Sequence, residues 1–405
     1  MKKLSKVCAA AAIALATGTA AGWSQETIKI GGIAPLSPPG GVQTGESLRD
    51  GMTIAVDELN AGGGLMGKQV ELIVEDTSGV PEKGVAAFER LASEGVSAVT
   101  GSAHSAVCSA VGPVAHKHDI PFIAGECWSD SVTAAGIPEV FRITVANSLV
   151  YSVAADWVKE AGFKNIAIIS ENSDWGFGII DVFTKNLEDT GATVTSFTAE
   201  RTVSDFTPQL LQLKRAEPKP DLIVAGFTGS NLLLMLRQAY DLDLAPTADT
   251  AIFAAGADVL EPEFWNVMGD AGTYVIGNPA GLPGKPDTEL SRSFSKAYQE
   301  KFDRPANAVA MEGYDGVMVI AEAIKAAGST EGPALEEALR NLKWDGTRGQ
   351  IHFPQDKDPA WQFQQWPDVP IFVIQYTEPN QTPSEAAILW PRAEATVDEL
   401  VLKPE

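Results

Sequence analysis

Strand-like and helix-like stretches alternate along most of this chain, and that alternation constrains its fold more than any other feature. Residues 28–33 form a short apolar strand pattern, and residues 46–59 follow with apolar side chains at helical spacing. A strand pattern at 70–74 and a helix pattern at 81–93 repeat the unit. Such alternation predicts parallel sheets with helices on both faces. We therefore expect an α/β fold.

The same rhythm restarts in the middle of the chain. After a break near 144–147, strand patterns at 165–170 and 222–225 alternate with helix patterns at 175–189 and 231–240. Two blocks predict two parallel sheets, and 405 residues are enough for two domains. The last third differs, because long helix patterns dominate it and strand patterns are few.

Residues 1–21 have the three-part pattern of a secretory signal peptide. Lysines open the segment, an alanine-rich apolar run spans 7–16, and small residues follow at 19–21. A transmembrane anchor is the alternative, but spanning a bilayer takes ~20 apolar residues and this run is shorter. We therefore expect export with cleavage and a mature protein that is not inserted in a membrane.

The charge of the chain limits its partners. It carries 53 acidic and 30 basic residues, which gives a net charge of −23 at pH 7. An acidic surface of this kind repels nucleic acid and anionic lipid, so neither is expected as a partner. The charge does not identify a ligand.

Two cysteines, Cys108 and Cys127, remain after the predicted cleavage. An even number in an oxidising compartment favours a disulfide, and two free thiols are the alternative. The bridge would close a loop of about 20 residues, which is worth roughly 3 kcal/mol on the chain-entropy model.

Several polar residues follow predicted strands, where parallel sheets place their ligands. Ser105 opens a helix after a strand that ends near Gly101. There the free N–H groups of the helix favour an anionic group, and the hydroxyl would add a donor. The alternative role of Ser105 is that of an ordinary helix cap.

Two further loops combine acidic and aromatic side chains. Glu126 and Trp128 follow the next strand, and a carboxylate beside an indole suits an amine or quaternary ammonium group. The alternative is a surface glutamate and a tryptophan packed at a domain edge. Trp175 opens a helix after the strand at 165–170 and either stacks on a ligand or packs in the core.

Enzyme motifs are absent or incomplete. The glycine-rich stretch at 62–68 follows a helix pattern, and Gln69 replaces the hydroxyl residue that a phosphate-binding loop needs. His116 and His118 are two apart on a predicted helix and make a poor metal pair. We therefore expect no enzyme activity, no metal and no cofactor.

The chain resembles the leucine/isoleucine/valine-type, or type I, periplasmic binding proteins of ABC importers. The resemblance runs from about 28 to 353. It rests on LNAGGG at 59–64, Gly101 through Ser105, DWGFG at 174–178, LRQA at 236–239, YDGV at 314–317 and GQIHF at 349–353. Each stretch is weak alone, but together they follow the family's order.

The resemblance implies two Rossmann-like lobes with parallel sheets, joined by a hinge of three chain crossings. We place the crossings near 144–147, 276–279 and 349–353. The first lobe would then comprise 26–145 plus 278–349, and the second 146–277 plus 350–405. Such a protein closes in the periplasm around a small polar solute, an amino acid or a related amide or amine. It would be a monomer that delivers the solute to the membrane permease subunits of an ABC importer.

The family's ligand positions are carried over residue by residue. They fall on Ser105, Glu126, Trp128, Trp175, Phe227 and Thr228, and, before the first helix, on Gln43 and Thr44. Amino-acid binders of the family place an acid after a later strand. Here that place reads AAGA at 254–257, and Asp258 comes two residues late. Our hypothesis is that Glu126 instead recognises a cationic nitrogen, flanked by Trp128 and Trp175.

Two other functions remain open at this point. A ligand-sensing ectodomain of the same fold would need a transmembrane span or a dedicated partner. An exported α/β enzyme would need a catalytic constellation, although the lack of a motif does not prove its absence.

Overall fold

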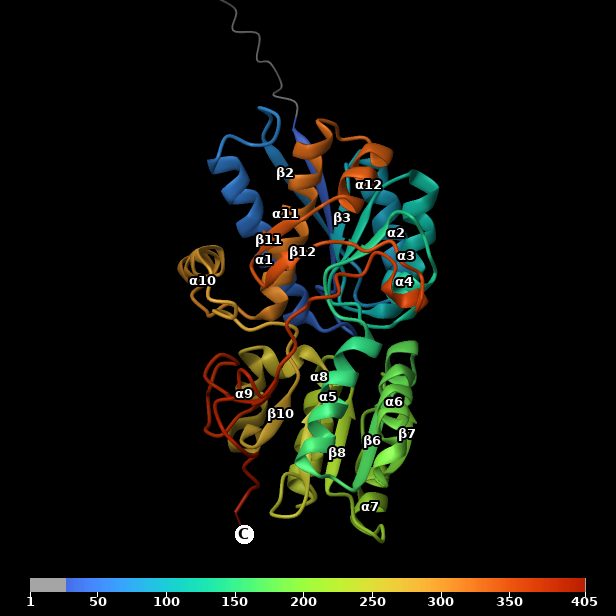
Figure 1. Ribbon diagram of the computed structural model, residues 1–405, viewed down its shortest axis with the longest axis vertical. Helices are drawn as coiled ribbons and strands as arrows, with labels where there is room; N and C mark the ends of the chain where they lie inside the picture. Colours follow the sequence, from blue (N-terminus) through green and yellow to red (C-terminus); the bar gives the residue numbers. More distant parts are fainter. Residues whose placement is uncertain (1–26, 405) are drawn as a thin grey trace, which may run out of the picture.

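The computed structural model describes residues 27–404, so the predicted signal peptide lies outside the described residues. Two separate sheets define two lobes, stacked along the long axis of the molecule (Figure 1). The expected α/β class with two lobes and parallel sheets is confirmed. Among residues 27–404, no helix has the length and apolar content to cross a bilayer.

The first lobe is built on a five-stranded parallel sheet in the order β2-β1-β3-β4-β5. Its strands are β1 (Ile28–Ala34), β2 (Val70–Asp76), β3 (Val99–Gly101), β4 (Phe122–Ala124) and β5 (Val140–Arg142). The early helices of this lobe are α1 (Val42–Ala61), α2 (Pro81–Ser93), α3 (Ser105–His118) and α4 (Ser131–Ala134). The inner strands are buried on both faces, which explains why they read as continuous apolar runs.

The long helices of the last third return to the first lobe. They are α10 (Glu289–Phe302), α11 (Ala308–Ala327) and α12 (Gly332–Arg340), followed by the hairpin of β11 (Trp344–Gly346) and β12 (Gly349–Ile351). α11 packs along α1, and Gly51 and Gly313 let the two backbones approach closely. A Cβ atom on Gly51 would lie 1.9 Å from the carbonyl oxygen of Ala310.

The second lobe is built on a seven-stranded sheet in the order β14-β13-β10-β9-β8-β6-β7. Its strands are β6 (Asn165–Glu171), β7 (Thr193–Ala199), β8 (Leu222–Gly226), β9 (Ala251–Ala254), β10 (Val275–Gly277), β13 (Val373–Gln375) and β14 (Ala387–Trp390). Its helices include α5 (Asn147–Ala161), α6 (Asp174–Leu187), α7 (Thr207–Lys214), α8 (Ser230–Asp241) and α9 (Glu263–Met268). The strands from β6 to β10 are parallel, and only β13 and β14 run antiparallel to their neighbours.

The first two crossings between the lobes follow β5 and β10. The chain leaves β5 and enters α5 across 143–147, and it leaves β10 toward the first lobe across 278–280. The third crossing lies later than the expected 349–353. The Thr133 hydroxyl donates to the Trp361 carbonyl at 2.6 Å, and Gln365 forms a parallel bridge to Arg142.

The stretch that follows β12 therefore packs on the first lobe, although the expected division gave 350–405 to the second. The chain changes lobes between Trp366 and β13. The reason is that Gln364 and Gln365 are satisfied by first-lobe groups: the Gln364 amide donates to the Val140 carbonyl at 2.6 Å. Sequence periodicity does not encode such side-chain pairing.

Candidate ligand-binding cleft

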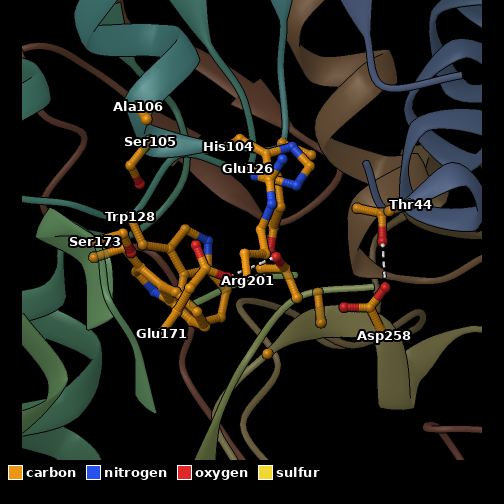
Figure 2. Close-up of a pocket in the computed structure, with 16 residues that line it drawn as sticks. Thr44, His104, Ser105, Ala106, Glu126, Trp128, Glu171, Ser173, Arg201 and Asp258 are labelled. Carbon is orange, nitrogen blue, oxygen red and sulfur yellow. Dashed lines mark hydrogen bonds between the residues drawn. The ribbon is translucent and has the colours of Figure 1, made fainter. Parts of the chain in front are cut away.

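A cavity lies between the two lobes and encloses about 600 Å³ of empty space, part of it open to solvent. Figure 2 shows side chains from both lobes meeting around it. Its lining residues are Gly41, Thr44, Ala103, His104, Ser105, Ala106, Glu126, Trp128, Glu171, Ser173, Trp175, Arg201, Thr228, Gly256, Ala257 and Asp258.

Topology explains why these residues meet. The first-lobe residues come from the start of α1 and from the loops after β3 and β4. The second-lobe residues come from the ends of β6, β7, β8 and β9 or directly after them. Parallel strands point their carboxyl ends to one edge, and here both sheets turn that edge toward the cleft.

Ser105 is the first residue of α3, and its side chain does not cap that helix. Its Oγ accepts from the Ser129 N–H at 2.9 Å, and the N-cap position is taken by His104. The hydroxyl hydrogen of Ser105 and the first N–H groups of α3 thus stand at the cleft as donors. Ser105 therefore lines the cavity and does not act as the cap of α3, which was its alternative role.

Glu126 lines the same wall and is 8% exposed. Burial raises the pKa of Glu126 well above its ordinary value, and the neighbouring Glu312 carboxyl raises it further. Arg348 acts in the opposite direction. The alternative prediction, that Glu126 is a salt-bridged glutamate on the surface, is therefore wrong, because Glu126 is buried and its neighbour is another carboxyl group.

Both predicted tryptophans line the cavity. Trp128 is 4% exposed and packs against Tyr151 with ring centroids 6.2 Å apart. Its indole N–H has no hydrogen-bond partner among the described residues. Trp175 is 7% exposed, and its carbonyl accepts from the Asn147 side chain at 2.9 Å. The two rings come from opposite lobes and line the same cavity.

Asp258, which follows the AAGA stretch at 254–257, also lines the cavity. Asp258 lies in a short 3₁₀ helix after β9, and its Oδ2 accepts from the Gly229 N–H at 2.8 Å. Its Oδ1 accepts from the Thr44 hydroxyl at 3.4 Å, across the cleft. Burial raises the pKa of Asp258.

Glu171 and Arg201 also line the cavity, and sequence reasoning missed both. Glu171 is the last residue of β6 and accepts from the Thr228 hydroxyl at 3.0 Å. Burial raises the pKa of Glu171, while the charge of Arg201 opposes the shift. Arg201 reaches across the cleft and donates to the Gly79 carbonyl at 2.9 Å. The position of Glu171 at the end of a buried strand could have predicted its place in the cavity. Arg201 follows the edge strand β7, and no pattern in the sequence predicted its place.

His104 was missed as well. Its imidazole lies against Gly79, and burial lowers its pKa to about 3, with Arg201 adding to the effect. The ring is therefore neutral at physiological pH. Neither ring nitrogen has a partner among the described residues. Figure 2 shows His104 and Arg201 together beside Glu126.

Two carried-over residues do not line the cavity. Phe227 is fully buried and packs edge-on against Phe206 with centroids 4.7 Å apart, so it belongs to the core of the second lobe. Gln43 points to the carboxylates of Glu46 and Glu263, 3.2 and 3.3 Å from its amide nitrogen. Their neighbours Thr228 and Thr44 take the cleft positions, because successive residues of a loop or of a helix point in different directions. Gln43 and Thr44 lie in the first turn of α1 and not before it, where they were expected.

The structure joins Cys108 and Cys127 by a disulfide. The bridge connects the first turn of α3 to the loop after β4, and both cysteines are buried. It therefore links the segment that carries Ser105 to the segment that carries Glu126 and Trp128.

Comparison with known proteins places this geometry in context. The profile of a family described as periplasmic binding protein matches residues 27–363. The Leu/Ile/Val-binding protein BraC3 of Rhizobium johnstonii is 29% identical over 78% of this chain and 84% of its own length. A Pseudomonas aeruginosa protein named for binding leucine, isoleucine, valine, threonine and alanine is 26% identical over 88% of this chain and 93% of its own length.

Solved structures share the fold. The branched-chain amino-acid binding protein LivJ of Streptococcus pneumoniae, in complex with isoleucine, superposes with a TM-score of 0.77 at 22% identity, covering 90% of this chain and all of that one. A Rhodopseudomonas palustris solute-binding protein in complex with benzoate superposes with a TM-score of 0.77 at 20% identity, covering 93% and 99%. One fold thus holds both zwitterionic and aromatic-acid ligands.

Proposed function

This chain belongs to the periplasmic binding protein family, and we propose that it is the solute-binding component of an ABC importer. In this proposal the cleft captures a small polar solute, an amino acid or a related amide or amine with a cationic nitrogen. The lobes close on the solute, and the closed form delivers it to the permease subunits in the membrane.

The charges of the side chains that line the cavity support a ligand with a cationic nitrogen. Three carboxyl groups line it, those of Glu126, Glu171 and Asp258, whereas Arg201 is the one guanidinium or ammonium group in the lining. Burial is the largest cause that raises the pKa of each of the three carboxyls. A cationic nitrogen bound beside these carboxyl groups would stabilise their charged form. The indoles of Trp128 and Trp175 add aromatic faces that attract cations.

A carboxylate on the same solute has its own partners. The hydroxyl of Ser105 and the start of α3 favour an anionic group. Arg201 faces the cleft from the other lobe and keeps donors beyond the one that it gives to Gly79. An amino acid offers both charges at once, which fits the names of the relatives. An amine or amide would use the acidic side alone.

Localisation and partners follow from the same proposal. A leader at 1–21 would export the chain to the periplasm, and the family description matches that compartment. The protein would act as a monomer that meets its permease through both lobes. The relatives are binding proteins, which favours a receptor over the enzyme alternative.

The first experiment measures ligand-induced stabilisation. The mature protein is unfolded, washed free of bound solute, refolded and screened by thermal shift. The panel contains aliphatic amino acids, amides, quaternary amines, polyamines and aromatic acids. A ligand present at 100 times its Kd adds about 2.7 kcal/mol to the free energy of unfolding. Stabilisation by aromatic acids alone would contradict the proposed ligand class.

A substitution then tests the role of Glu126. In Glu126→Gln the volume is kept and the negative charge is lost, so Kd for the cationic solute should rise at least tenfold, about 1.4 kcal/mol. The matched control is Glu139→Gln, because Glu139 is a buried first-lobe glutamate that contacts His116 and does not line the cavity. Unchanged binding by the Glu126 variant, with its circular dichroism intact, would overturn the hypothesis.

A further inference from the structure

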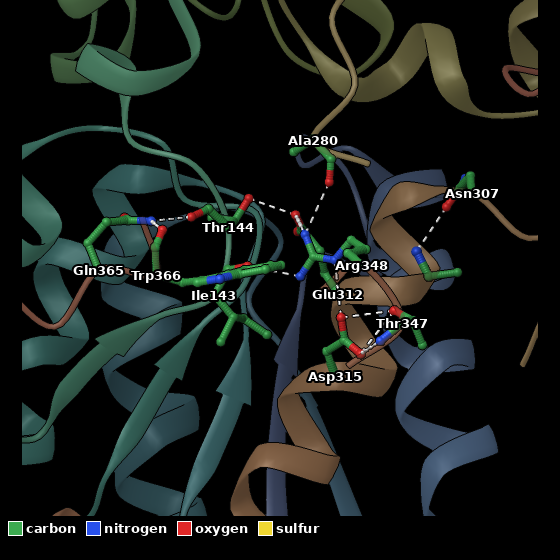
Figure 3. Close-up of polar contacts among 11 residues, drawn as sticks. Ile143, Thr144, Ala280, Asn307, Glu312, Asp315, Thr347, Arg348, Gln365 and Trp366 are labelled. Carbon is green, nitrogen blue, oxygen red and sulfur yellow. Dashed lines mark hydrogen bonds and ion pairs between the residues drawn. The ribbon is translucent and has the colours of Figure 1, made fainter. Parts of the chain in front are cut away.

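One buried guanidinium contacts all three crossings between the lobes (Figure 3). The Nη2 of Arg348 donates to the Ile143 carbonyl at 2.9 Å, on the first crossing. Its Nη1 donates to the Ala280 carbonyl at 3.2 Å, on the second. At the start of the third, the guanidinium stacks on the ring of Trp366, 5.2 Å from the centroid. The side chain of Arg348 is fully buried.

The first and third crossings are also joined to each other beside Arg348. The side-chain nitrogen of Gln365 donates to the Thr144 carbonyl at 2.6 Å. The Thr144 hydroxyl in turn donates to Glu312 Oε1 at 2.7 Å. Segments that are far apart in the sequence thus share one polar cluster at the pivot between the lobes.

Two acids of α11 hold the guanidinium in place. Asp315 Oδ2 accepts from Arg348 Nε at 3.1 Å, and Glu312 Oε1 accepts from Arg348 Nη1 at 2.9 Å. Thr347 donates its N–H and its hydroxyl to Asp315, both at 2.9 Å. A buried charge of this kind persists only when its hydrogen bonds are satisfied, so the cluster has little freedom to rearrange.

Glu312 is fully buried behind the cleft and does not itself line the cavity. Its second oxygen, Oε2, has no hydrogen-bond partner among the described residues. Its charge acts on the cleft residue Glu126, whose pKa is raised by burial and then by Glu312. Glu312 therefore stands between the cleft residue Glu126 and the hinge residue Arg348, and it interacts with both.

We propose that Arg348 is the positioning residue of the hinge, which holds the three crossings in one arrangement, and that Glu312 transmits to it the charge of a ligand bound at Glu126. A cationic group at Glu126 changes the field at Glu312 and so the strength of its bond to Arg348. The transmission by Glu312 rests on the proposed function, whereas the role of Arg348 in the hinge does not.

The physical basis is the shape of the guanidinium. Arginine presents five donors in a rigid plane, so one side chain serves two carbonyls, two carboxylates and an aromatic face together. A lysine at the same place would keep the charge but offer three donors from one atom. It could not hold all the crossings at once, and the lobes would sample more relative orientations.

The hinge part is tested without any ligand. Fluorescent or spin labels are attached to cysteines introduced at Glu82 on α2 and Thr184 on α6, which are exposed and lie on opposite lobes. In ligand-free protein, Arg348→Lys should broaden the interlobe distance distribution at least twofold. The control is Leu339→Ala, which destabilises the first-lobe core away from the crossings and should leave the width unchanged. Equal widths in Arg348→Lys and the parent would overturn the inference.

Two further variants complete the design. If Arg348→Lys does not fold, Trp366→Phe, which removes part of the stacking surface on the third crossing, must give the same broadening. Glu312→Gln keeps the volume and an acceptor for Arg348 but removes the charge. It should change Kd for a cationic ligand at least fivefold. In this variant, replacing Glu126 as well should no longer alter the ligand-induced change in the interlobe label distance. No change in Kd would refute the transmission step alone, and absence of any ligand would refute the proposed function while leaving the distance result standing.

Discussion

At the scale of single residues, Glu261 carries a carboxyl group that is buried where the two lobes meet. Its Oε2 accepts from the Ser47 hydroxyl at 2.8 Å and from the Asn307 side chain at 2.9 Å, both in the first lobe. Burial raises the pKa of Glu261 to about 7, and the charge of Asp258 adds to the shift. Arg304 opposes it.

This shift makes stability depend on pH. The folded pKa of about 7 lies above the ordinary 4.5, so the contribution is full below 4.5 and is lost as pH rises through 7. The loss is of order 3 kcal/mol at 1.36 kcal/mol per pKa unit. Glu261→Gln should remove it and be more stable than the parent at pH 8. Urea unfolding between pH 5 and 8 measures the difference, and parallel curves for the two proteins would contradict the prediction.

At the scale of elements, the disulfide couples α3 to the loop after β4. It closes a segment with a sequence separation of 19 between Cys108 and Cys127. Both ends of that segment lie beside ligand-facing residues, Ser105 at one end and Glu126 and Trp128 at the other. The bridge therefore limits how far the two first-lobe ligand segments move apart.

Removing the bridge should cost stability and affinity together. The double variant Cys108→Ser/Cys127→Ser should lose about 3 kcal/mol of unfolding free energy, the value for a loop of this length. It should also bind its solute more weakly, because the two segments are no longer pre-organised. Denaturant unfolding and calorimetric titration measure the two effects. Wild-type protein with reduced thiols is the control, and an unchanged denaturation midpoint in both would contradict the expectation.

At the scale of the whole molecule, polar contacts join the two lobes. Arg201 bonds to Gly79, and Glu261 bonds to Ser47, each between the lobes. Arg201→Gln removes a charged donor from this set, so the ligand-free protein should be more open in small-angle scattering. Kd should rise roughly tenfold, about 1.4 kcal/mol. A radius of gyration and a Kd that both match the parent would show that Arg201 does not hold the lobes together.

The sequence by itself determined the α/β class, the two sheets and several cleft positions. The reason is that burial on both faces of a strand and the turn that follows it are local properties, readable from apolar runs and glycine turns. Ser105, Trp128 and Trp175 line the cavity because each directly follows such a strand. The same reasoning gave a wrong prediction for Phe227, because adjacent residues in a turn face opposite sides and Phe227 points into the core.

Only the tertiary structure decided what meets across the cleft and at the pivot. Arg201 and Glu261 acquire partners from the other lobe, and Arg348 gathers three segments that are distant in the sequence. The third crossing lies late because two glutamine side chains are satisfied by the first lobe. Periodicity records which face of an element is buried, but the partner of a buried polar group depends on how the lobes are placed.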